Sequence, residues 1–284
     1  MRFVKGHGTE NDFVLLPDPD GILDLTPVLI RALCDRRAGL GADGILRVVR
    51  SEHAPAGAPE RARAPWFMDY YNADGTTAEM CGNGIRLYAR YLVEAGLAAP
   101  GSLRLGTRSG VREVRLAATG DVTVEMGAAR ITGPASAAID GESYDGVRVD
   151  MGNPHLVCLV DRPLADYDLT SSPAVSGAAF PDGVNVELVS VVSERHLAMR
   201  VHERGVGETP SCGTGACAVA VAMAARSGAD RGEWTVDVPG GRLGVVVGPD
   251  AVWLRGPAVI VAAGAIDAAW LAAASGSRPV ELRS

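Results

Sequence analysis

The chain contains the same short motif twice, each time just before an apolar run. Cys-Gly-Asn-Gly occupies residues 81–84, and Cys-Gly-Thr-Gly occupies residues 212–215. One such motif is a weak signal, because glycine-rich stretches often form turns. Two copies in matching settings predict a duplicated chain in which two equivalent helices begin directly after a cysteine.

The duplication extends beyond the two cysteines. Aligned without a gap, Met68 matches Met199 and Asn72 matches Glu203, so each half has a strand-like run and a polar loop before its cysteine. Residues 11–16 (NDFVLL) resemble residues 153–159 (NPHLVCL), and residues 43–46 resemble residues 182–186 more weakly. Three echoes in the same order predict two related halves, with the boundary after residue 126.

Short valine-rich runs bounded by Gly, Pro or Asp predict many strands. The expected strands are Gly44–Val49, Ala64–Tyr71, Val111–Leu116, Val122–Met126, Val147–Met151, Leu156–Val160, Val184–Val192, Leu197–His202, Thr235–Val238, Leu243–Val247 and Ala251–Arg255. The expected helices are Pro27–Cys34, Gly84–Glu94, Thr214–Ser227 and Asp267–Ala274. Residues 216–225 are apolar on every side, which predicts a buried helix with a sheet wrapped around it. The mixture indicates an α+β fold, with Ser51–Pro65 as an exposed loop between strands.

Composition and charge exclude several function classes. The formal net charge is −7 without a block of Lys or Arg, so neither nucleic acid nor an anionic membrane is expected as a partner. The N-terminus does not resemble a signal peptide, and no apolar run is long enough to span a bilayer. We therefore expect a cytoplasmic protein. An odd number of cysteines, five, argues against a disulfide framework, and their spacing does not predict a metal site.

A cysteine at a helix start is suited to proton transfer beside a carboxylate. The helix N-terminus offers unpaired N–H groups and a partial positive charge. Gly82 and Gly213 allow a ligand carboxylate to approach that backbone closely. The same field is expected to lower the cysteine pKa below its usual value of about 8.5. Two opposed thiols could remove a proton from one face of a carbon and return one to the other face, as a racemase or epimerase requires.

Removing the α-proton of an amino acid usually needs pyridoxal phosphate. The chain has one lysine, Lys5, and no motif marks it as a Schiff-base residue. We therefore expect no cofactor, with the backbone donors of the two helix starts stabilising the charge that develops. The two thiols would titrate as a coupled pair.

Taken together, six motifs resemble the diaminopimelate epimerase family. They are Asn-Asp-Phe at 11–13, Asn-Ala-Asp-Gly at 72–75, Cys-Gly-Asn-Gly at 81–84, Met-Gly-Asn-Pro-His at 151–155, Glu-Arg-Gly at 203–205 and Cys-Gly-Thr-Gly at 212–215. The resemblance implies two pseudosymmetric halves, each a mostly antiparallel sheet curled around a central helix. It also implies that residues 127–267 form the second half and that residues 268–284 return to the first half, residues 1–126.

The resemblance further implies a cofactor-independent isomerase that interconverts LL- and meso-2,6-diaminoheptanedioate in lysine and cell-wall precursor synthesis, acting as a homodimer. Cys81 and Cys212 match the acid and base of such enzymes, and His155 and Glu203 match the groups that assist the thiols. The implied substrate contacts are Asn11, Asn72, Gly82, Asn83, Asn153, Asn185, Glu203, Arg204, Gly213 and Thr214.

Three other functions stay open from the residues alone. A proline-type racemase also uses two thiols, but its cyclic substrate has no distal carboxylate for Arg204 and the asparagines to bind. A thiol-redox enzyme usually has its cysteines close in sequence, and a cysteine hydrolase needs only one nucleophile. A binding module without catalysis would not explain two matched thiols.

Overall fold

The computed structural model describes residues 1–229 and 231–276, which pack into two units. Unit 1 comprises Met1–Gly8, Asp12–Gly120 and the described part of Ala258–Ser284, and unit 2 comprises Thr9–Asn11 and Asp121–Pro257. The division falls before β7 (Val122–Gly127) rather than after it, because β7 pairs with β17 (Val252–Gly256). The return to unit 1 begins with β18 (Val259–Ala265), ahead of the expected residue 268, because β18 pairs with β1 (Arg2–Gly8). Residues 277–284 of the expected return lie outside the described residues.

Unit 1 is a sheet with three helices. Its strands are β1, β2 (Asn11–Pro17), β3 (Gly44–Arg50), β4 (Trp66–Asn72), β5 (Gly101–Thr107), β6 (Gly110–Leu116) and β18. Its helices are α1 (Pro27–Cys34), α2 (Gly82–Glu94) and α4 (Ala268–Ala274). The strands pair in the order β18-β1-β2-β3-β4-β5-β6, and the β2–β3 and β4–β5 pairings are parallel.

Unit 2 repeats this arrangement. Its strands are β7, β8 (Arg130–Ile139), β9 (Glu142–Asp150), β10 (Pro154–Leu159), β11 (Ala174–Val175), β12 (Asn185–Ser193), β13 (His196–Glu203), β14 (Gly207–Thr209), β15 (Gly232–Val238), β16 (Gly241–Val247) and β17. The path β8-β9-β10-β12-β13-β15-β16-β17-β7 has its parallel steps at β10–β12 and β13–β15. These steps correspond to β2–β3 and β4–β5, so the duplication predicted from the sequence is confirmed in the topology.

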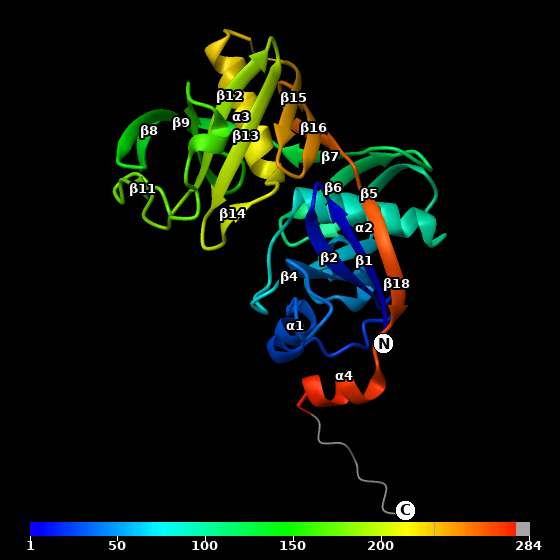
Figure 1. The fold of residues 1–284 in the computed structure, drawn as a ribbon. Helices are drawn as coiled ribbons and strands as arrows, with labels where there is room; N and C mark the ends of the chain where they lie inside the picture. Colours follow the sequence, from blue (N-terminus) through cyan, green and yellow to red (C-terminus); the bar gives the residue numbers. More distant parts are fainter. Residues whose placement is uncertain (230, 277–284) are drawn as a thin grey trace, which may run out of the picture. The chain divides into compact units, whose positions relative to one another are not determined.

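Each sheet curls around one helix. In unit 1, α2 packs against β1 and β18 at one end of the strand order and against β6 at the other. In unit 2, α3 (Gly213–Arg226) packs against β9, β10, β12, β15, β16 and β17. Figure 1 shows α2 beside β1 and β18, and α3 behind β12. The expected fold, two mostly antiparallel sheets each curled around a central helix, is confirmed.

The buried faces of the two central helices differ in composition. Most of α3 is alanine and valine, and 10 of its 14 residues are buried, as its uniformly apolar sequence predicts. The helix α2 buries Arg86 and Arg90. Arg90 donates to the carbonyls of Ala117, Ala118 and Gly120, so its charge is compensated by backbone oxygens of the segment after β6.

Residues 51–65 connect β3 to β4 and are more ordered than the predicted exposed loop. They contain two short 3₁₀ helices, Ser51–His53 and Ala58–Glu60. Unit 2 has a similar short 3₁₀ helix at Leu164–Asp166. The Ser51 hydroxyl donates to the carbonyl of Ala64 at 2.6 Å, and both residues are buried. The ends of the segment are therefore fixed to the core, while Arg61 between them is exposed.

Candidate active site

Cys81 is the N-cap of α2. Its backbone is extended (φ −139°, ψ 122°), and its Sγ accepts a hydrogen bond from the Gly84 N–H at 3.4 Å. This is the contact by which an N-cap side chain satisfies a donor of the first turn. The thiol of Cys81 is only partly buried. It therefore lies where the backbone donors of a helix start converge, as the sequence predicts.

Arg86, whose side chain is wholly buried, holds the first turn of α2 in place. Its guanidinium donates to the carbonyl of Gly82 at 3.1 Å and to Oδ1 of Asn83 at 3.0 Å. Asn83 itself is 1% exposed. Gly82 and Asn83 are thus a rigid part of the helix start.

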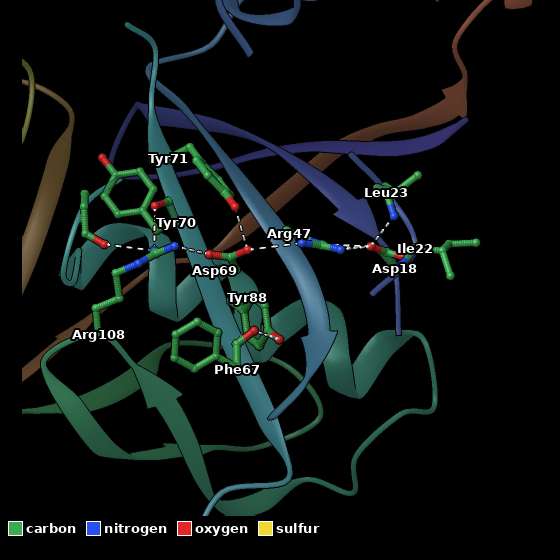
Figure 2. Close-up of polar contacts among 11 residues, drawn as sticks. Asp18, Ile22, Leu23, Arg47, Phe67, Asp69, Tyr70, Tyr71, Tyr88 and Arg108 are labelled. Atoms are coloured by element: carbon green, nitrogen blue, oxygen red, sulfur yellow. Dashed lines mark hydrogen bonds and ion pairs between the residues drawn. The ribbon is translucent and has the colours of Figure 1, made fainter. Parts of the chain in front are cut away.

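Asn72 lies at the end of β4, and its side-chain amide donates to Thr76 Oγ1 at 3.0 Å. Arg108 secures the segment that follows, because it donates to the carbonyl of Tyr70 at 3.0 Å and to that of Ala78 at 3.3 Å. Figure 2 shows Arg108 also paired with Asp69 on β4. The segment leading to Cys81 is therefore tied to β4 by a guanidinium.

Cys212 is the N-cap of α3 and occupies a different environment from Cys81. It is 5% exposed, and its Sγ lies 3.5 Å from Thr214 Oγ1. Burial raises the pKa of the Cys212 thiol well above its ordinary value, and the carboxylates of Glu203 and Glu187 act in the same direction. The Thr214 hydroxyl and the Gly215 N–H act oppositely but do not prevail. The predicted lowering of the pKa is therefore wrong for Cys212, because desolvation outweighs the helix start.

Polar contacts through Thr214 connect His155 and Asn153 to Cys212. His155 is wholly buried, and its Nδ1 lies 2.6 Å from Oε1 of Glu187 on β12. Its Nε2 lies 3.1 Å from Oδ1 of Asn153. The Asn153 amide then donates to Thr214 Oγ1 at 3.5 Å. A continuous set of contacts within unit 2 thus connects a buried carboxyl group to the thiol.

Asn185, Glu203 and Arg204 form a second group in unit 2. The Asn185 amide donates to the carbonyl of Pro154 at 3.2 Å, and its Oδ1 accepts from the backbone N–H of Arg204 at 2.9 Å. Glu203 accepts a hydrogen bond from the Thr209 hydroxyl. Asn185 therefore joins the start of β10 to the end of β13, where Glu203 and Arg204 lie.

The segment Thr9–Asn11 belongs with unit 2 although it lies early in the sequence. Thr9 is 1% exposed, and its hydroxyl shares a hydrogen bond of 2.7 Å with that of Ser211, the residue before Cys212. Asn11 is partly exposed at the start of β2. The contacts of this segment thus place Asn11 with the unit that contains Cys212.

The structure therefore groups the predicted residues by unit. In unit 2 it places together His155, Asn153, Asn185, Glu203, Arg204, Cys212, Gly213 and Thr214. In unit 1, Asn72, Cys81, Gly82 and Asn83 lie at or beside the start of α2. Glu187 is absent from the predicted set. Its signal is an acidic residue inside the apolar run of β12, on the strand that pairs with the strand of His155.

The described residues, 1–229 and 231–276, contain neither a metal-binding cluster nor a membrane-spanning helix. No cluster of three or more His, Cys, Asp or Glu side chains there could hold a metal ion. No helix in those ranges has the length and apolar character needed to cross a membrane.

Comparison with known proteins gives a consistent family. The family model described as diaminopimelate epimerase matches residues 3–132 and 147–261. A diaminopimelate epimerase from Thermobifida fusca is 54% identical over 268 residues, which cover 93% of this chain and 97% of that protein. A diaminopimelate epimerase from Streptomyces coelicolor is 54% identical over 280 residues, covering 95% of this chain and 97% of that protein.

Solved structures with the same fold are more distant in sequence. A phenazine biosynthesis protein of the PhzF family from Bacillus anthracis matches with a TM-score of 0.68 at 16% identity, covering 93% of this chain and 98% of that one. A hydroxyproline epimerase from Agrobacterium vitis matches with a TM-score of 0.65 at 15% identity, covering 93% and 90%. At these identities the likeness concerns the fold alone.

Proposed function

The chain belongs to the diaminopimelate epimerase family and is an isomerase of that class, and we propose that Cys81 and Cys212 are its paired acid and base. The observation that supports this assignment best is the equivalent placement of the two thiols. Each is the N-cap of the central helix of its own duplicated unit. The substrate we propose is 2,6-diaminoheptanedioate, interconverted between its LL and meso forms.

In the proposed reaction, a thiolate at one cysteine removes the α-proton and becomes a thiol. The thiol at the other cysteine donates its proton to the opposite face of the same carbon and becomes a thiolate. The charge that develops on the substrate spreads into the α-carboxylate, which the N–H groups after Cys81 and Cys212 are suited to bind. Each turnover exchanges the protonation states of the two sulfurs, so no external acid or base is consumed.

We propose that the enzyme works without pyridoxal phosphate. Lys5 is the lone lysine of the chain, and a Schiff base would require its neutral amine. Its ammonium group pairs with Asp12 and donates to the carbonyl of Gly41 on unit 1. These contacts already engage the amine within unit 1, which supports a mechanism that leaves this lysine out.

The remaining residue roles are proposals of the same kind. We assign Asn11, Asn72, Asn153, Asn185 and Arg204 to substrate contacts. Arg204 suits the distal carboxylate, because its backbone is fixed by Asn185 and its side chain is exposed. We also assign the paired glycine-containing starts of α2 and α3 to the α-carboxylate, and His155 and Glu203 to assistance of the thiols.

A proline-type racemase is the second candidate, since a hydroxyproline epimerase shares the fold. Relatives near 50% identity favour the diaminopimelate substrate instead. We propose that the enzyme acts in cytoplasmic lysine and cell-wall precursor synthesis, where both cysteines would stay reduced. A homodimer is also proposed, and it is supported by the largely exposed apolar residues of β18, of which Val261 is 63% exposed.

Deuterium exchange tests the proposed function directly. Incubation of the enzyme with LL-diaminopimelate in D₂O should place deuterium at one α-carbon as the meso isomer forms, as followed by NMR. Cys81→Ala and Cys212→Ala should each abolish isomerisation, because each removes one of the two proton carriers. Isomerisation that survives either substitution would contradict the paired mechanism. Exchange with L-proline, in place of diaminopimelate, would favour the second candidate.

A further inference from the structure

Glu187 is a buried carboxyl group that the proposed mechanism does not use. It lies on β12 with 0% of its surface exposed. Its Oε1 lies 2.6 Å from Nδ1 of His155, itself 0% exposed. Its other oxygen, Oε2, is buried and has no hydrogen-bond partner among the described residues.

This environment favours a protonated carboxyl group. An ionised carboxylate with one oxygen left without a partner in a buried site is costly, and the cost falls when the group is neutral. Burial raises the pKa of Glu187, the carboxylate of Glu203 acts in the same direction, and His155 opposes both. With the proton on Oε1, Glu187 donates to Nδ1, and His155 is then neutral with its proton on Nε2.

That tautomer fixes the direction of every following contact. The His155 Nε2–H donates to Oδ1 of Asn153 at 3.1 Å. The Asn153 amide must then present its NH₂ group to Thr214 Oγ1, at 3.5 Å. The Thr214 hydroxyl, 3.5 Å from Sγ of Cys212, accepts from Asn153 and can donate its own proton to the sulfur. A donor aimed at sulfur stabilises the thiolate more than the thiol.

We propose that Glu187 is a positioning residue, whose proton on His155 Nδ1 directs a chain of donors through Asn153 and Thr214 onto the sulfur of Cys212. The proposal rests on the function assigned above to Cys212. Packing at the start of α3 supports it independently. A Cβ placed on Gly215 would lie 2.8 Å from Oε1 of Glu187 and 3.4 Å from Sγ of Cys212, so the first turn is pressed against both groups.

The test compares Glu187→Gln with Glu187→Met. The glutamine amide can still donate to Nδ1 and keep the chain directed toward sulfur, whereas methionine has no donor. The measurement is the pH dependence of the rate of alkylation by iodoacetamide, resolved by peptide mass spectrometry and extended above pH 10, because burial raises the pKa of Cys212. Cys81 in the same molecules is the internal control. Asp237→Asn is the matched variant, since it disrupts a partly exposed acid–histidine pair with His196 in the same unit.

We expect the Cys212 midpoint to stay in place in Glu187→Gln and to rise by about one pH unit in Glu187→Met, since a weakened charge-assisted hydrogen bond is worth about that much. The Cys81 midpoint should not move in any variant. Three other titratable side chains lie near this site, namely His155 and Cys158 on β10 and Glu203 on β13, and neither substitution replaces any of them.

The opposite sign would overturn the proposal. If Glu187 is ionised, both substitutions remove a negative charge beside the thiol, and the Cys212 midpoint falls in both. An unchanged Cys212 midpoint in Glu187→Met would likewise show that the series of donors from Glu187 to Thr214 does not act on the thiol. Should the methionine variant not fold, ¹⁵N NMR of histidine-labelled wild-type protein decides the matter. A neutral Nε2–H tautomer at His155 is expected, and an imidazolium would refute the proposal. None of these measurements needs substrate, so the proposal for Glu187 can fail or succeed independently of the deuterium-exchange test of the proposed function.

Discussion

The buried ion pairs of unit 1 lead to a quantitative prediction about stability. Asp69 is 5% exposed and pairs with Arg108, accepts from the Tyr71 hydroxyl at 2.8 Å and lies 3.6 Å from Arg47. Arg47 in turn pairs with Asp18 at 2.6 Å, and Figure 2 shows the four charged groups in a row. Asp69→Asn preserves the shape of the side chain and removes the charge from the centre of this row.

Removing one partner of a buried ion pair typically costs 3–5 kcal/mol. Here the loss falls at the lower end, because Arg47 keeps Asp18 and Arg108 keeps its two backbone carbonyls. We therefore expect Asp69→Asn to lower the free energy of unfolding by about 3 kcal/mol. Urea unfolding followed by circular dichroism measures the change.

Glu60→Gln is the matched control. It removes the partner of Arg63 from a pair whose side chains are 30% and 67% exposed, so we expect a change of less than about 1 kcal/mol. If Asp69→Asn costs no more than this control, the row of charges does not stabilise unit 1, and the reasoning from its burial is refuted.

Two further predictions concern unit 2. Burial raises the pKa of Cys158 from 9.0 to about 12, so the unfolded chain ionises this thiol as the pH passes 9 while the folded chain retains the proton. Its contribution to stability is therefore present below pH 9 and lost above it. Between pH 8 and pH 10 the wild type should lose about 1.4 kcal/mol that Cys158→Ala does not lose, as measured by urea unfolding in reductant; equal losses would contradict this. Gly215→Ala should destabilise the protein by about 1–3 kcal/mol and impair turnover, since its methyl group meets Glu187. The methyl group of the equivalent Gly84→Ala comes no closer than 3.3 Å to its neighbours, at a methyl group of Leu46, so its effect on unfolding should be smaller, and an equal effect would count against the packing argument.

The helices were predictable because their signals are local. The helix Pro27–Cys34 has the predicted bounds, and the Thr26 hydroxyl accepts from the Leu29 N–H as an N-cap should. The central helices begin one or two residues earlier than predicted, because their first glycines already have helical geometry. Capping and composition operate within a few residues, so a single sequence contains enough information to locate them.

Strands whose own residues give a weak local signal were missed. Residues 130–139 include Gly133 and Pro134, which disfavour a strand, yet they pair along most of β9. Residues 259–265 show no alternation of apolar and polar residues, and their pairing with β1 comes from the other end of the chain. These strands are stabilised by their cross-strand contacts and not by the intrinsic preferences of their residues, so the sequence alone does not indicate them.

The candidate site divides in the same way. The cysteines and their glycines were predictable, because the duplicated motif places them at helix starts. The importance of Glu187 was not, since it depends on the parallel register that pairs His155 with Asn185 and so sets Glu187 on the same face, two residues along. The direction of the Cys212 pKa was also hidden, because it is decided by burial.

The unlike surroundings of the two thiols have a kinetic consequence. Cys81 is partly open and accepts one backbone hydrogen bond, while Cys212 is enclosed beside carboxyl groups. An enzyme cannot shift the ratio of its substrate's stereoisomers at equilibrium, so this mismatch can appear only in rates. In the proposed mechanism, conversion in one direction starts from a thiolate at Cys212, whose pKa is raised by burial, and conversion in the other starts from a thiolate at the partly open Cys81. The two directions should therefore reach their maximal velocities at different pH values, even though the halves share one ancestral plan.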